Sequence, residues 1–481
     1  MRLSEVVAGA ASQADPDITG LVYDSGAAGP GTLFFCVPGF TSDGHDHAPA
    51  AVRRGAAALV VQKPLHLGVP EVRVASVRAA MAPAAARFHD DPTATLRVVG
   101  VTGTNGKTTT AFLVRALLEA AGRRCGLLGT VTSVIGGRER AVQRTTPEAI
   151  DLQATFREML DAGDEACSME VSSHALGLRR ADAVHWAAVV FTNLTQDHLD
   201  FHGTMEDYFQ AKRLLFAAAG EQEQPGAMLV NVDDPYGRRL VDEFPAAVTF
   251  AVAGDAAWRA RGVSTGPAGS RFVVVGPEGE LEVASPLPGA FNVSNVLGAV
   301  AAVHALGVPP AVVAEALPHA GRVPGRFEPV EEGQDFAVLV DYAHTPDSLE
   351  NVLRAARELG AGRLVCVFGC GGDRDRAKRP LMGEIASRLA DRIVVTSDNP
   401  RSEDPEAIIA EIVGGSGGEV EVLVDRREAI SRSVEDARAG DVVVIAGKGH
   451  EHGQELADGR KVPFDDVKVA REALRGAALP R

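Results

Sequence analysis

The stretch Gly100-Val101-Thr102-Gly103-Thr104-Asn105-Gly106-Lys107-Thr108-Thr109-Thr110 decides the fold of this chain. It follows an apolar segment at 96–99 and opens an amphipathic segment at 111–121, which predicts a strand, a loop and a helix. In such a loop the glycines let the backbone turn, and the amides at the helix N-terminus face an anion. Lys107 would reach the outer phosphates, and the Thr108 hydroxyl would ligate magnesium. The stretch therefore predicts a nucleoside triphosphate site.

The glycine spacing differs from that of a strict P-loop. A strict P-loop has a glycine five residues before Gly106-Lys107-Thr108 begins, and that position is Val101. The glycines stand instead at 100, 103 and 106. A Gly/Thr-rich turn that merely connects a strand to a helix is the alternative, but the Lys-Thr pair at the helix start favours a phosphate loop. The shifted pattern restricts which kind of ATPase this is.

The length and net charge of the chain limit its number of domains and the kinds of partner that it can bind. At 481 residues the chain should hold about three domains, at roughly 150 residues each. Apolar residues make up 46% and charged residues 23%, as in an ordinary globular protein with sizeable cores. The net charge of -16 argues against a nucleic-acid partner, because an acidic surface repels phosphate chains. Any anionic substrate must therefore be met by local positive charge.

Cysteine usage and the N-terminus indicate the compartment. The five cysteines are odd in number, and Cys366 and Cys370 have no second pair, so neither a disulfide framework nor a zinc site is expected. Residues 1–17 lack the basic start and apolar run of a secretion signal, and no apolar stretch is long enough to span a bilayer. We expect a cytoplasmic protein.

Apolar strand candidates alternate with helical patterns along the chain. The first ~90 residues form a small α/β unit, and the next boundary is expected near 321–325. Such alternation predicts mostly parallel sheets covered by helices on both faces. The predicted domains are 1–93, 94–322 and 323–481. The main strand candidates are 97–101, 126–131, 166–171, 187–191, 228–232, 337–340, 364–368, 393–396 and 442–446, with helices expected at 348–359 and 381–389.

Polar residues follow most of these strands, where parallel sheets bind their ligands. Two such rims suggest a cleft between two domains. In the central series the polar segments are Arg144-Thr145-Thr146-Pro147, Glu170-Val171-Ser172-Ser173-His174 and Asn193 to His198. In the C-terminal series they are Asp341 to His344, Gly371-Gly372-Asp373-Arg374, Asp398-Asn399-Pro400-Arg401 and Gly447 to Glu451.

Three residues are candidates for metal chemistry. Glu170 ends a buried-looking strand, where a carboxylate needs a partner, and magnesium bound to phosphates with Thr108 as co-ligand supplies one; a helix-capping carboxylate is the alternative. His198 is either a second metal ligand or a hydrogen-bonding surface residue. On pattern alone, Lys212 is expected on the exposed face of an amphipathic helix.

Together these motifs resemble the Mur ligase family over nearly the whole chain. The segments that carry the resemblance are Gly103 to Thr109, Thr145-Thr146-Pro147, Glu170 to His174, Asp197 to His202 and Gly369 to Asp375. The family's glycine pattern also accounts for the shifted spacing.

The resemblance implies an ATP-dependent amide ligase in peptidoglycan precursor synthesis, with an N-terminal UDP-sugar-binding domain, a central ATP-binding domain and a C-terminal amino-acid-binding domain. It implies that ATP phosphorylates the side-chain carboxylate of the D-glutamyl residue of UDP-N-acetylmuramoyl-L-alanyl-D-glutamate, and that the amine of meso-diaminopimelate attacks the acyl phosphate. The catalytic residues would be Lys107, Glu170, His198 and Lys212. Two Mg²⁺ ions would be held by Thr108, Glu170, His198 and Lys212 as a carbamate.

The resemblance also assigns the substrate contacts. ATP would meet Gly103, Thr104, Asn105, Gly106, Lys107, Thr108, Thr109, Asn292, Arg326, Asp341 and His344. The UDP-muramoyl dipeptide would meet Tyr23, Ser25, Phe40, Thr41, Ser42, Thr145, Thr146, Ser172 and Arg180. Diaminopimelate would meet Arg374, Asp398, Asn399, Pro400, Arg401, Gly447 and Glu451. The chain departs from the family pattern at Leu178 and at His452-Gly453-Gln454.

The resemblance also implies that Arg401 goes with meso-diaminopimelate, because in the family an arginine at this position can pair bidentately with the extra carboxylate of that amino acid. A lysine-adding member of the family is the first alternative. A folylpolyglutamate or cyanophycin synthetase-like ligase and a P-loop ATPase that is not a ligase are further alternatives. The chain is expected to act on small molecules as a monomer, without a nucleic-acid partner or a membrane span.

Overall fold

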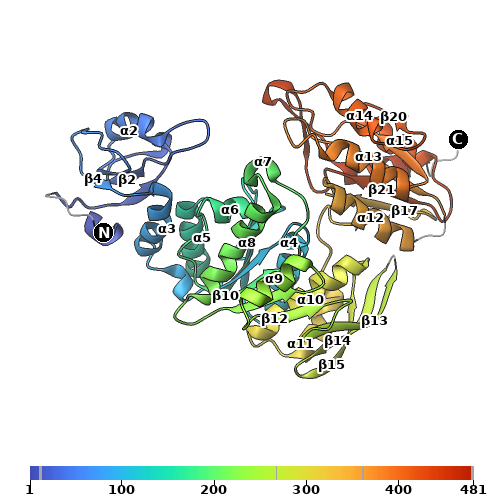
Figure 1. Ribbon diagram of the computed structural model, residues 1–481, viewed down its shortest axis with the longest axis horizontal. Helices are drawn as coiled ribbons and strands as arrows, with labels where there is room; N and C mark the ends of the chain where they lie inside the picture. The colour runs from blue at the N-terminus through green and yellow to red at the C-terminus, as the bar shows by residue number, and fades with distance from the viewer. Residues whose placement is uncertain (10–13, 267, 360–361, 478–481) are drawn as a thin grey trace. The chain divides into compact units, whose positions relative to one another are not determined.

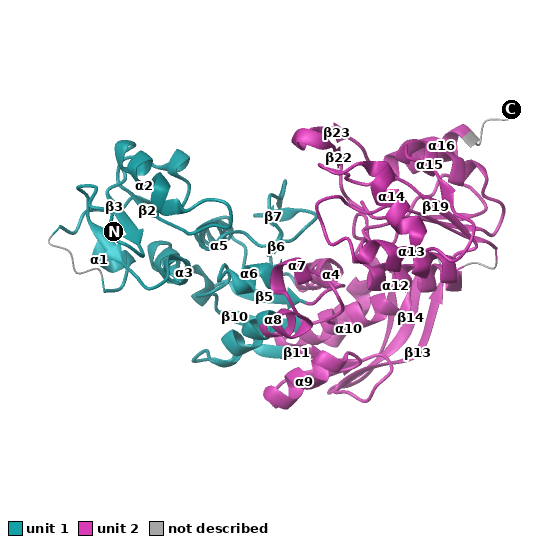
Figure 2. Cartoon of the chain, turned by 45° about the horizontal axis from the view of Figure 1, so that its top comes forward, with its two compact units in different colours: residues 1–102, 122–190, 211–228 teal, residues 103–121, 191–210, 229–481 magenta. Residues whose placement is uncertain are grey.

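The computed structural model describes residues 1–9, 14–266, 268–359 and 362–477. They form two compact units (Figure 2). Unit 1 comprises residues 1–102, 122–190 and 211–228, and unit 2 comprises residues 103–121, 191–210 and 229–481. The phosphate-loop segment and the C-terminal third of the chain thus belong to the same unit.

The N-terminal part of unit 1 is a small parallel sheet with helices (Figure 1). Its strand order is β1-β2-β3-β4, and every neighbouring pair is parallel. The burial of all four β3 residues matches a sheet covered on both faces. The elements are α1 (Leu3–Val6), β1 (Gly20–Val22), η1 (Ser25–Ala27), β2 (Thr32–Phe35), α2 (Gly44–Arg53), β3 (Ala58–Val61), β4 (Glu71–Arg73), α3 (Val77–Phe88) and η2 (Pro92–Ala94).

The second sheet region of unit 1 has the strand order β10-β5-β9-β6-β7-β8. The predicted strands at 97–101, 166–171 and 187–191 are confirmed. The antiparallel extension β7 and β8 was not predicted from the sequence. The elements are β5 (Arg97–Thr102), β6 (Cys125–Leu128), β7 (Ser133–Ile135), β8 (Arg138–Arg140), α5 (Ala149–Asp161), β9 (Ala166–Glu170), α6 (Ser173–Gly177) and β10 (Trp186–Phe191).

The glycine at position 100 serves packing within the sheet. Gly100 lies inside β5, and a Cβ atom there would come within 2.6 Å of Cζ3 of Trp186. Trp186 is buried at the start of β10. The unusual glycine spacing therefore combines a packing glycine in a strand with the glycines of the loop that follows.

Unit 2 contains the helix that follows the phosphate loop and a second run of strands, ordered β15-β14-β13-β12-β11. β13, β14 and β15 form an antiparallel meander that the sequence did not predict. The elements are α4 (Lys107–Ala120), α7 (Leu199–His202), β11 (Ala227–Asn231), α9 (Pro235–Glu243), β12 (Val248–Ala251), β13 (Trp258–Gly266), β14 (Gly269–Gly276), β15 (Gly279–Ser285), α10 (Ala290–Ala305), α11 (Pro310–Ala316) and η3 (Leu317–His319). Helix α8 (Met205–Gly220) continues from unit 2 into unit 1 at residue 211.

The C-terminal part of unit 2 is a six-stranded sheet ordered β16-β17-β21-β18-β19-β20, parallel except for the pairing of β16 with β17. α12, α13 and α14 pack on one face, while α15 and α16 pack on the other. This confirms the predicted α/β class. The elements are β16 (Glu328–Pro329), β17 (Ala337–Asp341), α12 (Pro346–Leu359), β18 (Leu364–Phe368), α13 (Lys378–Leu389), β19 (Arg392–Val395), α14 (Pro405–Gly414), β20 (Glu421–Val422), α15 (Arg426–Glu435), β21 (Val442–Ala446), β22 (Gly453–Glu455), η4 (Ala457–Gly459), β23 (Lys461–Pro463) and α16 (Asp466–Ala477).

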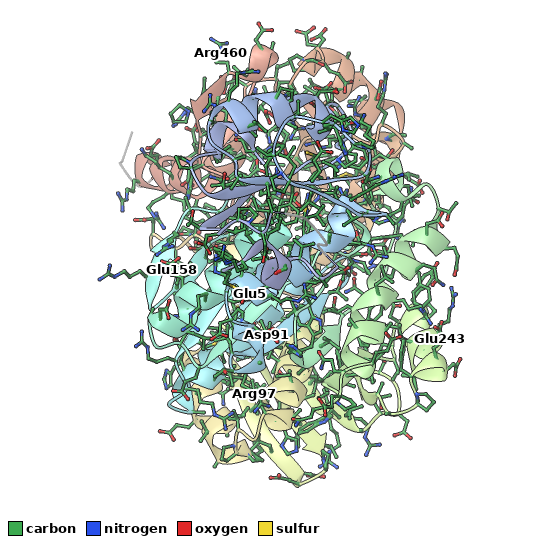
Figure 3. The ribbon with its side chains drawn as sticks, turned by 90° about the vertical axis from the view of Figure 1, so that its left-hand side faces the viewer. Glu5, Asp91, Arg97, Glu158, Glu243 and Arg460 are labelled. Carbon is green, nitrogen blue, oxygen red and sulfur yellow. The ribbon has the colours of Figure 1, made fainter. Side chains whose placement is uncertain are left out.

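Glu158, Glu243 and Arg460, which Figure 3 labels, are exposed charged side chains. Within the described ranges, no helix combines the length and apolar character needed to cross a membrane.

Candidate functional site

The loop between β5 and α4 is fixed by side chains of unit 2. Gly103 has φ 148°, and a Cβ atom there would lie 1.9 Å from Oγ1 of Thr192. Gly106 has φ 86°, and a Cβ atom there would lie 2.3 Å from Oδ1 of Asn295. Both positions therefore require glycine, for conformation and for space.

Asn105 in this loop is held by hydrogen bonds to its backbone and to its side chain. Its backbone N–H donates to Oδ1 of Asn193 at 2.9 Å, and its carbonyl accepts from Oγ1 of Thr192 at 2.6 Å. Its side-chain amide donates to Oδ2 of Asp347 at 2.7 Å, and Oγ1 of Thr195 donates to the same oxygen at 3.1 Å. Asp347 belongs to α12, so the loop and the C-terminal sheet region are hydrogen-bonded within unit 2.

Lys107 and Thr108 open α4, as predicted. Lys107 Nζ donates to the carbonyls of Gly103 and Thr104, at 2.9 and 2.7 Å. The ammonium thus bends back over the loop. Thr108 and Thr109 are buried, and the amides of this first helical turn complete a cradle suited to phosphate.

Arg326 reaches the same helix turn. Its Nη2 donates to Oγ1 of Thr108 at 3.1 Å, and its Cζ lies 4.4 Å from the centre of the Tyr342 ring. Arg326 Nε is buried and has no hydrogen-bond partner in the described structure. The structure therefore places Arg326 at the phosphate loop, and its Nε–H remains as a possible donor to a ligand.

Asp341 acts on the turn that carries Arg326. Its two oxygens accept from the backbone N–H groups of Phe327 and Ala343, at 2.6 and 2.7 Å. Phe327 has φ 48°, which is strained for a bulky residue and needs such support. Burial raises the pKa of Asp341 to about 6, against the lowering effect of Arg326 and of both N–H groups. Asp341 therefore supports the turn and does not simply project toward a ligand.

His344 and Asn292 are also held in place. Nδ1 of His344 donates to the carbonyl of Tyr342 at 2.8 Å, which leaves Nε2 as the acceptor of the neutral ring. Burial, followed by the charge of Lys378, lowers the pKa of His344, which favours that neutral form. Asn292 donates to the carbonyl of Pro288 and accepts from Asn295, so both ends of its amide are used within and next to α10.

His198 precedes α7 with φ 55°. Its Nε2 lies 3.4 Å from Oδ2 of Asp197, and its ring meets that of Tyr208 edge-on. Burial alone would raise the pKa of Asp197, but His198, His344 and Lys378 together lower it. Asp197 thus remains an anion amid positive or polar neighbours.

Unit 1 gathers polar residues around the end of β9. Oε1 of Glu170 accepts from the N–H of Thr130 at 2.7 Å, and Oε2 accepts from Oγ1 of Thr130 at 3.1 Å. A Cβ atom at Gly129 would lie 2.6 Å from Oε1 of the same carboxylate. The chain bends around Glu170 here, so β6 ends at Leu128 and the predicted strand at 126–131 is too long.

The predicted contacts for the dipeptide lie next to Glu170. Oγ1 of Thr145 is 3.1 Å from Oγ1 of Thr130, and Oγ1 of Thr146 donates to the carbonyl of Glu170 at 2.9 Å. The N–H of Ser172 donates to Oγ1 of Thr146 at 3.2 Å. The structure thus brings Thr145, Thr146 and Ser172 together at the carboxyl end of β9.

Arg180 joins this group through a buried carboxylate. Its Nη2 lies 2.9 Å from Oε1 of Glu148, which also pairs with Arg144 at 3.1 Å and, through Oε2, with Arg78 at 3.6 Å. Nη1 of Arg180 donates to the carbonyl of Thr146 at 3.4 Å. Three guanidinium groups around one carboxylate leave local positive charge, which this acidic protein needs for an anionic substrate.

The predicted UDP contacts lie in the N-terminal part of unit 1. Tyr23 donates from its hydroxyl to Oδ2 of Asp151 at 2.6 Å. Ser25 lies in η1, which Asp24 caps by accepting from the N–H of Gly26. Phe40 is 79% exposed, and Thr41 and Ser42 beside it are exposed as well.

Lys212 is the clearest correction to the pattern-based expectation. The sequence pattern placed it on an exposed helix face, but it is 1% exposed in α8. Tyr208, Leu215 and Phe216 on the same helix are buried too. The apolar face of α8 is therefore wide enough to include Lys212, which the periodicity alone could not show.

Several residues that were predicted to contact diaminopimelate form one hydrogen-bonded group in unit 2. Asn399 donates to Oε2 of Glu451 at 2.9 Å. Arg401 has φ 51° and donates from Nε to Oε2 of Glu455 at 3.0 Å and from Nη1 to the carbonyl of Gly372 at 2.7 Å. A Cβ atom at Gly447 would lie 2.5 Å from Oδ2 of Asp398, so this position also requires glycine.

Two other predicted residues flank this group. Pro400 is buried between Asn399 and Arg401 in the same segment. Arg374 is exposed and donates to the carbonyl of Asp373 at 2.9 Å.

Lys448 is a central residue of this group that the sequence reasoning missed. It is fully buried, and its Nζ donates to Oδ1 of Asn399 at 2.7 Å. It also lies 3.3 Å from both Oδ1 of Asp398 and Oε2 of Glu451. Its position between Gly447 and Glu451, both predicted contacts, was the available signal.

Glu170 and Thr108 offer a carboxylate and a hydroxyl oxygen, and Mg²⁺ prefers oxygen ligands. Glu170 is 1% exposed, and its oxygens retain lone pairs beyond the two bonds to Thr130. The Thr108 hydroxyl accepts from Nη2 of Arg326 at 3.1 Å, and the second lone pair of its oxygen remains for a cation. Histidine, cysteine, aspartate and glutamate form no metal-type group of three or more anywhere in the ranges that the structure describes.

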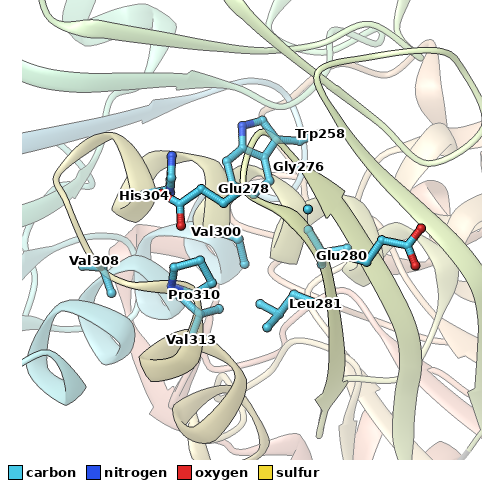
Figure 4. Close-up of a pocket in the computed structure, with 12 residues that line it drawn as sticks. Trp258, Gly276, Glu278, Glu280, Leu281, Val300, His304, Val308, Pro310 and Val313 are labelled. Carbon is cyan, nitrogen blue, oxygen red and sulfur yellow. The ribbon is translucent and has the colours of Figure 1, made fainter.

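A small apolar pocket lies elsewhere in unit 2 (Figure 4). It is lined by Trp258, Val274, Leu281, Val300 and Val313, with Glu278 and His304 close by. None of the predicted site residues lines it, so it is separate from the candidate site.

Three protein-family models match successive segments of the chain. They are described as "Mur ligase family, catalytic domain" at residues 17–94, "Mur ligase middle domain" at 101–303 and "Mur ligase, glutamate ligase domain" at 325–449.

Curated relatives named UDP-N-acetylmuramoyl-L-alanyl-D-glutamate--2,6-diaminopimelate ligase are similar over nearly the whole chain. The protein of Geobacillus thermodenitrificans is 47% identical, with 96% of each chain covered. The protein of Synechocystis is 48% identical, covering 95% of this chain and 92% of its own.

Two solved structures are similar to the chain over nearly its whole length. One described as UDP-N-acetylmuramoyl-L-alanyl-D-glutamate--2,6-diaminopimelate ligase has a TM-score of 0.70 and 34% identity, with 96% of each chain covered. A MurF ligase from Thermotoga maritima in complex with ADP has a TM-score of 0.63, covering 95% of this chain and 96% of its own; at 19% identity it shows likeness of fold alone.

Proposed function

Because the chain belongs to the Mur ligase family, we propose that it joins meso-diaminopimelate to UDP-N-acetylmuramoyl-L-alanyl-D-glutamate at the expense of ATP. The bond formed is an amide at the side-chain carboxylate of the D-glutamyl residue. The reaction belongs to the synthesis of peptidoglycan precursors. The observation that carries this choice is Arg401, held beside Asn399 and Glu451 in one network.

The nucleotide site of the proposed enzyme is the loop at 103–109. Its amides and Lys107 receive the phosphates, and Arg326 adds a second positive charge at Thr108. Bringing a phosphoryl group to a carboxylate places anions together, so fixed positive charge stabilises the transfer. Asp341 and His344 hold the segment beside Arg326, and Asn292 supports the loop through Asn295.

The dipeptide substrate meets unit 1. Thr145, Thr146, Ser172 and Arg180 hold the peptide part, while Tyr23, Ser25, Phe40, Thr41 and Ser42 contact the UDP-sugar. Arg180 and its neighbours supply positive charge to a substrate that carries several anionic groups. The D-glutamyl carboxylate attacks the γ-phosphorus of ATP, releases ADP and becomes an acyl phosphate.

Diaminopimelate binds at the network around Asn399. Arg401 pairs with the distal carboxylate, and Glu451 accepts from the distal ammonium. Arg374, Asp398, Pro400 and Gly447 complete the contacts. The proximal amine attacks the acyl carbonyl after losing its proton, and inorganic phosphate leaves as the amide forms.

We place Mg²⁺, two ions in all, at Thr108, Glu170, His198 and a carbamate on Lys212. When bound, Mg²⁺ supplies positive charge to the phosphate and carboxylate oxygens as they approach. A carbamate on Lys212 replaces a cation by an anion, which suits a metal ligand. The burial of Lys212 supports this assignment, because a free ammonium is costly to bury, whereas the charge of a carbamate would be paired with the metal.

The proposed enzyme has three domains, at 1–93, 94–322 and 323–481, and acts in the cytoplasm as a monomer. Its substrates are small molecules. An L-lysine-adding activity is the alternative that Arg401 disfavours, since lysine lacks the second carboxylate.

The test is ADP release with each substrate omitted in turn. The proposal requires release that depends on both the UDP-muramoyl dipeptide and diaminopimelate. Release with folates in place of the dipeptide would support a folylpolyglutamate synthase-like ligase. Equal hydrolysis without any acceptor would support an ATPase that is not a ligase, and either outcome would overturn the proposal.

A further inference from the structure

Strand β22 is joined to the segment 398–401 by three hydrogen bonds. Nε2 of Gln454 donates to the carbonyl of Asp398 at 2.6 Å, and the N–H of Glu455 donates to Oδ1 of Asn399 at 2.9 Å. The N–H of Arg401 donates to the carbonyl of Glu455 at 3.2 Å. The β22–β23 hairpin and the segment that selects the amino acid are therefore one structural piece.

The side chain of Glu455 acts on the guanidinium of Arg401. Oε2 of Glu455 accepts from Nε, and the carbonyl of Gly372 accepts from Nη1. The Arg401 side chain is 20% exposed, and its backbone adopts a left-handed conformation that a side chain as long as arginine rarely adopts. The arginine is thus fixed at backbone and side chain by the same glutamate.

These contacts leave a defined part of the guanidinium for a ligand. An arginine fork has five N–H donors, and Nε and one N–H of Nη1 are used here. Nη2 makes no hydrogen bond to the described residues. The end of the fork formed by Nη1 and Nη2 therefore remains for a carboxylate, which it can bind through two parallel bonds.

We propose that Glu455 is a positioning residue that presents the Nη1–Nη2 end of Arg401 to the distal carboxylate of the amino-acid substrate. Glu455 acts through Arg401 and does not itself touch the substrate. The inference rests on the proposed function, and it adds that selection of a two-carboxylate substrate depends on the β22–β23 hairpin as well as on Arg401.

The experiment measures steady-state ADP release by the full-length chain with the UDP-muramoyl dipeptide present. Glu455→Ala should raise the KM for meso-diaminopimelate about tenfold, with kcat within twofold and the KM for ATP unchanged. Glu455→Gln should restore the KM, because the amide oxygen can accept from Nε. Lys461→Ala is the matched control, since Lys461 lies opposite Glu455 across the hairpin and is exposed.

Several results would overturn the inference. A KM for diaminopimelate that is unchanged or lower in Glu455→Ala would mean that Glu455 is irrelevant to Arg401 or competes with the substrate. A Glu455→Gln variant as weak as Glu455→Ala would exclude positioning by this hydrogen bond, and a Lys461→Ala variant as weak as Glu455→Ala would point to general damage to the hairpin.

A variant that does not fold and a wild-type chain that does not use diaminopimelate are two further outcomes. Should Glu455→Ala not fold, Glu455→Asp, whose carboxylate is one methylene shorter, replaces it with the same expected rise in KM. A wild-type chain that does not use diaminopimelate overturns the proposed function and this inference with it, whereas normal use by the wild type and by Glu455→Ala overturns this inference alone.

Discussion

Arg326 donates from Nη2 to Oγ1 of Thr108, although 218 residues separate the two in sequence. This bond joins the start of the C-terminal segment to the first turn of the helix that follows the phosphate loop. The guanidinium of Arg326 also lies over the ring of Tyr342, so two contacts fix the direction of this side chain. Arg326 is therefore preset beside the phosphates of the proposed nucleotide.

Replacing Arg326 by alanine should raise the KM for ATP about tenfold, the expected loss for a charge-assisted bond of roughly 1.5 kcal/mol. The KM for the amino acid should change little. Arg322→Ala is the control, because Arg322 lies on the same connection and pairs only loosely with Glu331, at 3.9 Å. Equal effects of both substitutions would show that Arg326 has no specific role at the nucleotide.

Gly103→Ala should abolish ATP binding and destabilise the fold by at least about 2 kcal/mol, because the added Cβ meets Thr192 at 1.9 Å and φ is unfavourable. Gly418→Ala should be neutral, since a Cβ at Gly418 meets nothing within 4 Å. Thermal unfolding with and without ATP distinguishes them. Wild-type ATP stabilisation in Gly103→Ala would contradict the structure of the loop.

Asp341 should make stability fall as pH rises through the weakly acidic range. Its pKa is about 6 in the folded protein and about 3.9 in an unfolded chain, so the folded state holds the proton more tightly between these values. Stability from the protonated form is fully present below about pH 4 and is lost as pH rises through 6. Between pH 4.5 and 7 the loss is about 2 kcal/mol.

The measurement is the unfolding free energy of wild type minus that of Asp341→Asn, which does not titrate. That difference should decrease by about 2 kcal/mol from pH 4.5 to pH 7. A constant difference would show that Asp341 titrates normally.

Lys448→Met should destabilise unit 2 by about 3–5 kcal/mol, because it leaves the carboxylates of Asp398 and Glu451 without their buried cation. The KM for diaminopimelate should rise as well, since Asn399 loses a donor. Unfolding by denaturant measures the first effect and ADP release the second. Lys468→Met, at an exposed position, serves as control, and a Lys448 variant as stable as that control would refute the buried network.

The sequence predicted the elements whose pattern is local. The strand at 97–101, the start of α4 at Lys107 and the parallel C-terminal sheet followed from apolar runs and glycine positions, and the structure confirms them. The meander of β13 to β15 escaped prediction because β13 and the first half of β15 bury almost no residues, so only β14 shows alternate burial along most of its length.

The sequence could not predict features that depend on tertiary contacts. The burial of Lys212 and Lys448 depends on which face of the chain the rest of the fold covers. The bend after Leu128 depends on the Glu170 carboxylate, which accepts from the N–H of Thr130 across 40 residues of sequence. The pairing of Arg401 with Glu455 spans 54 residues and carries no periodic signal.

The most direct test of the central claim is an amino-acid panel on the wild-type chain. Meso-diaminopimelate, L-lysine and L-ornithine are compared at equal concentration, with ATP, Mg²⁺ and the UDP-muramoyl dipeptide, and the UDP-linked product is identified by mass. The account predicts efficient product formation with diaminopimelate and at least about a hundredfold lower kcat/KM with the other two, a difference of roughly 2.7 kcal/mol for one bidentate carboxylate pair. Preferred use of L-lysine or L-ornithine would contradict it.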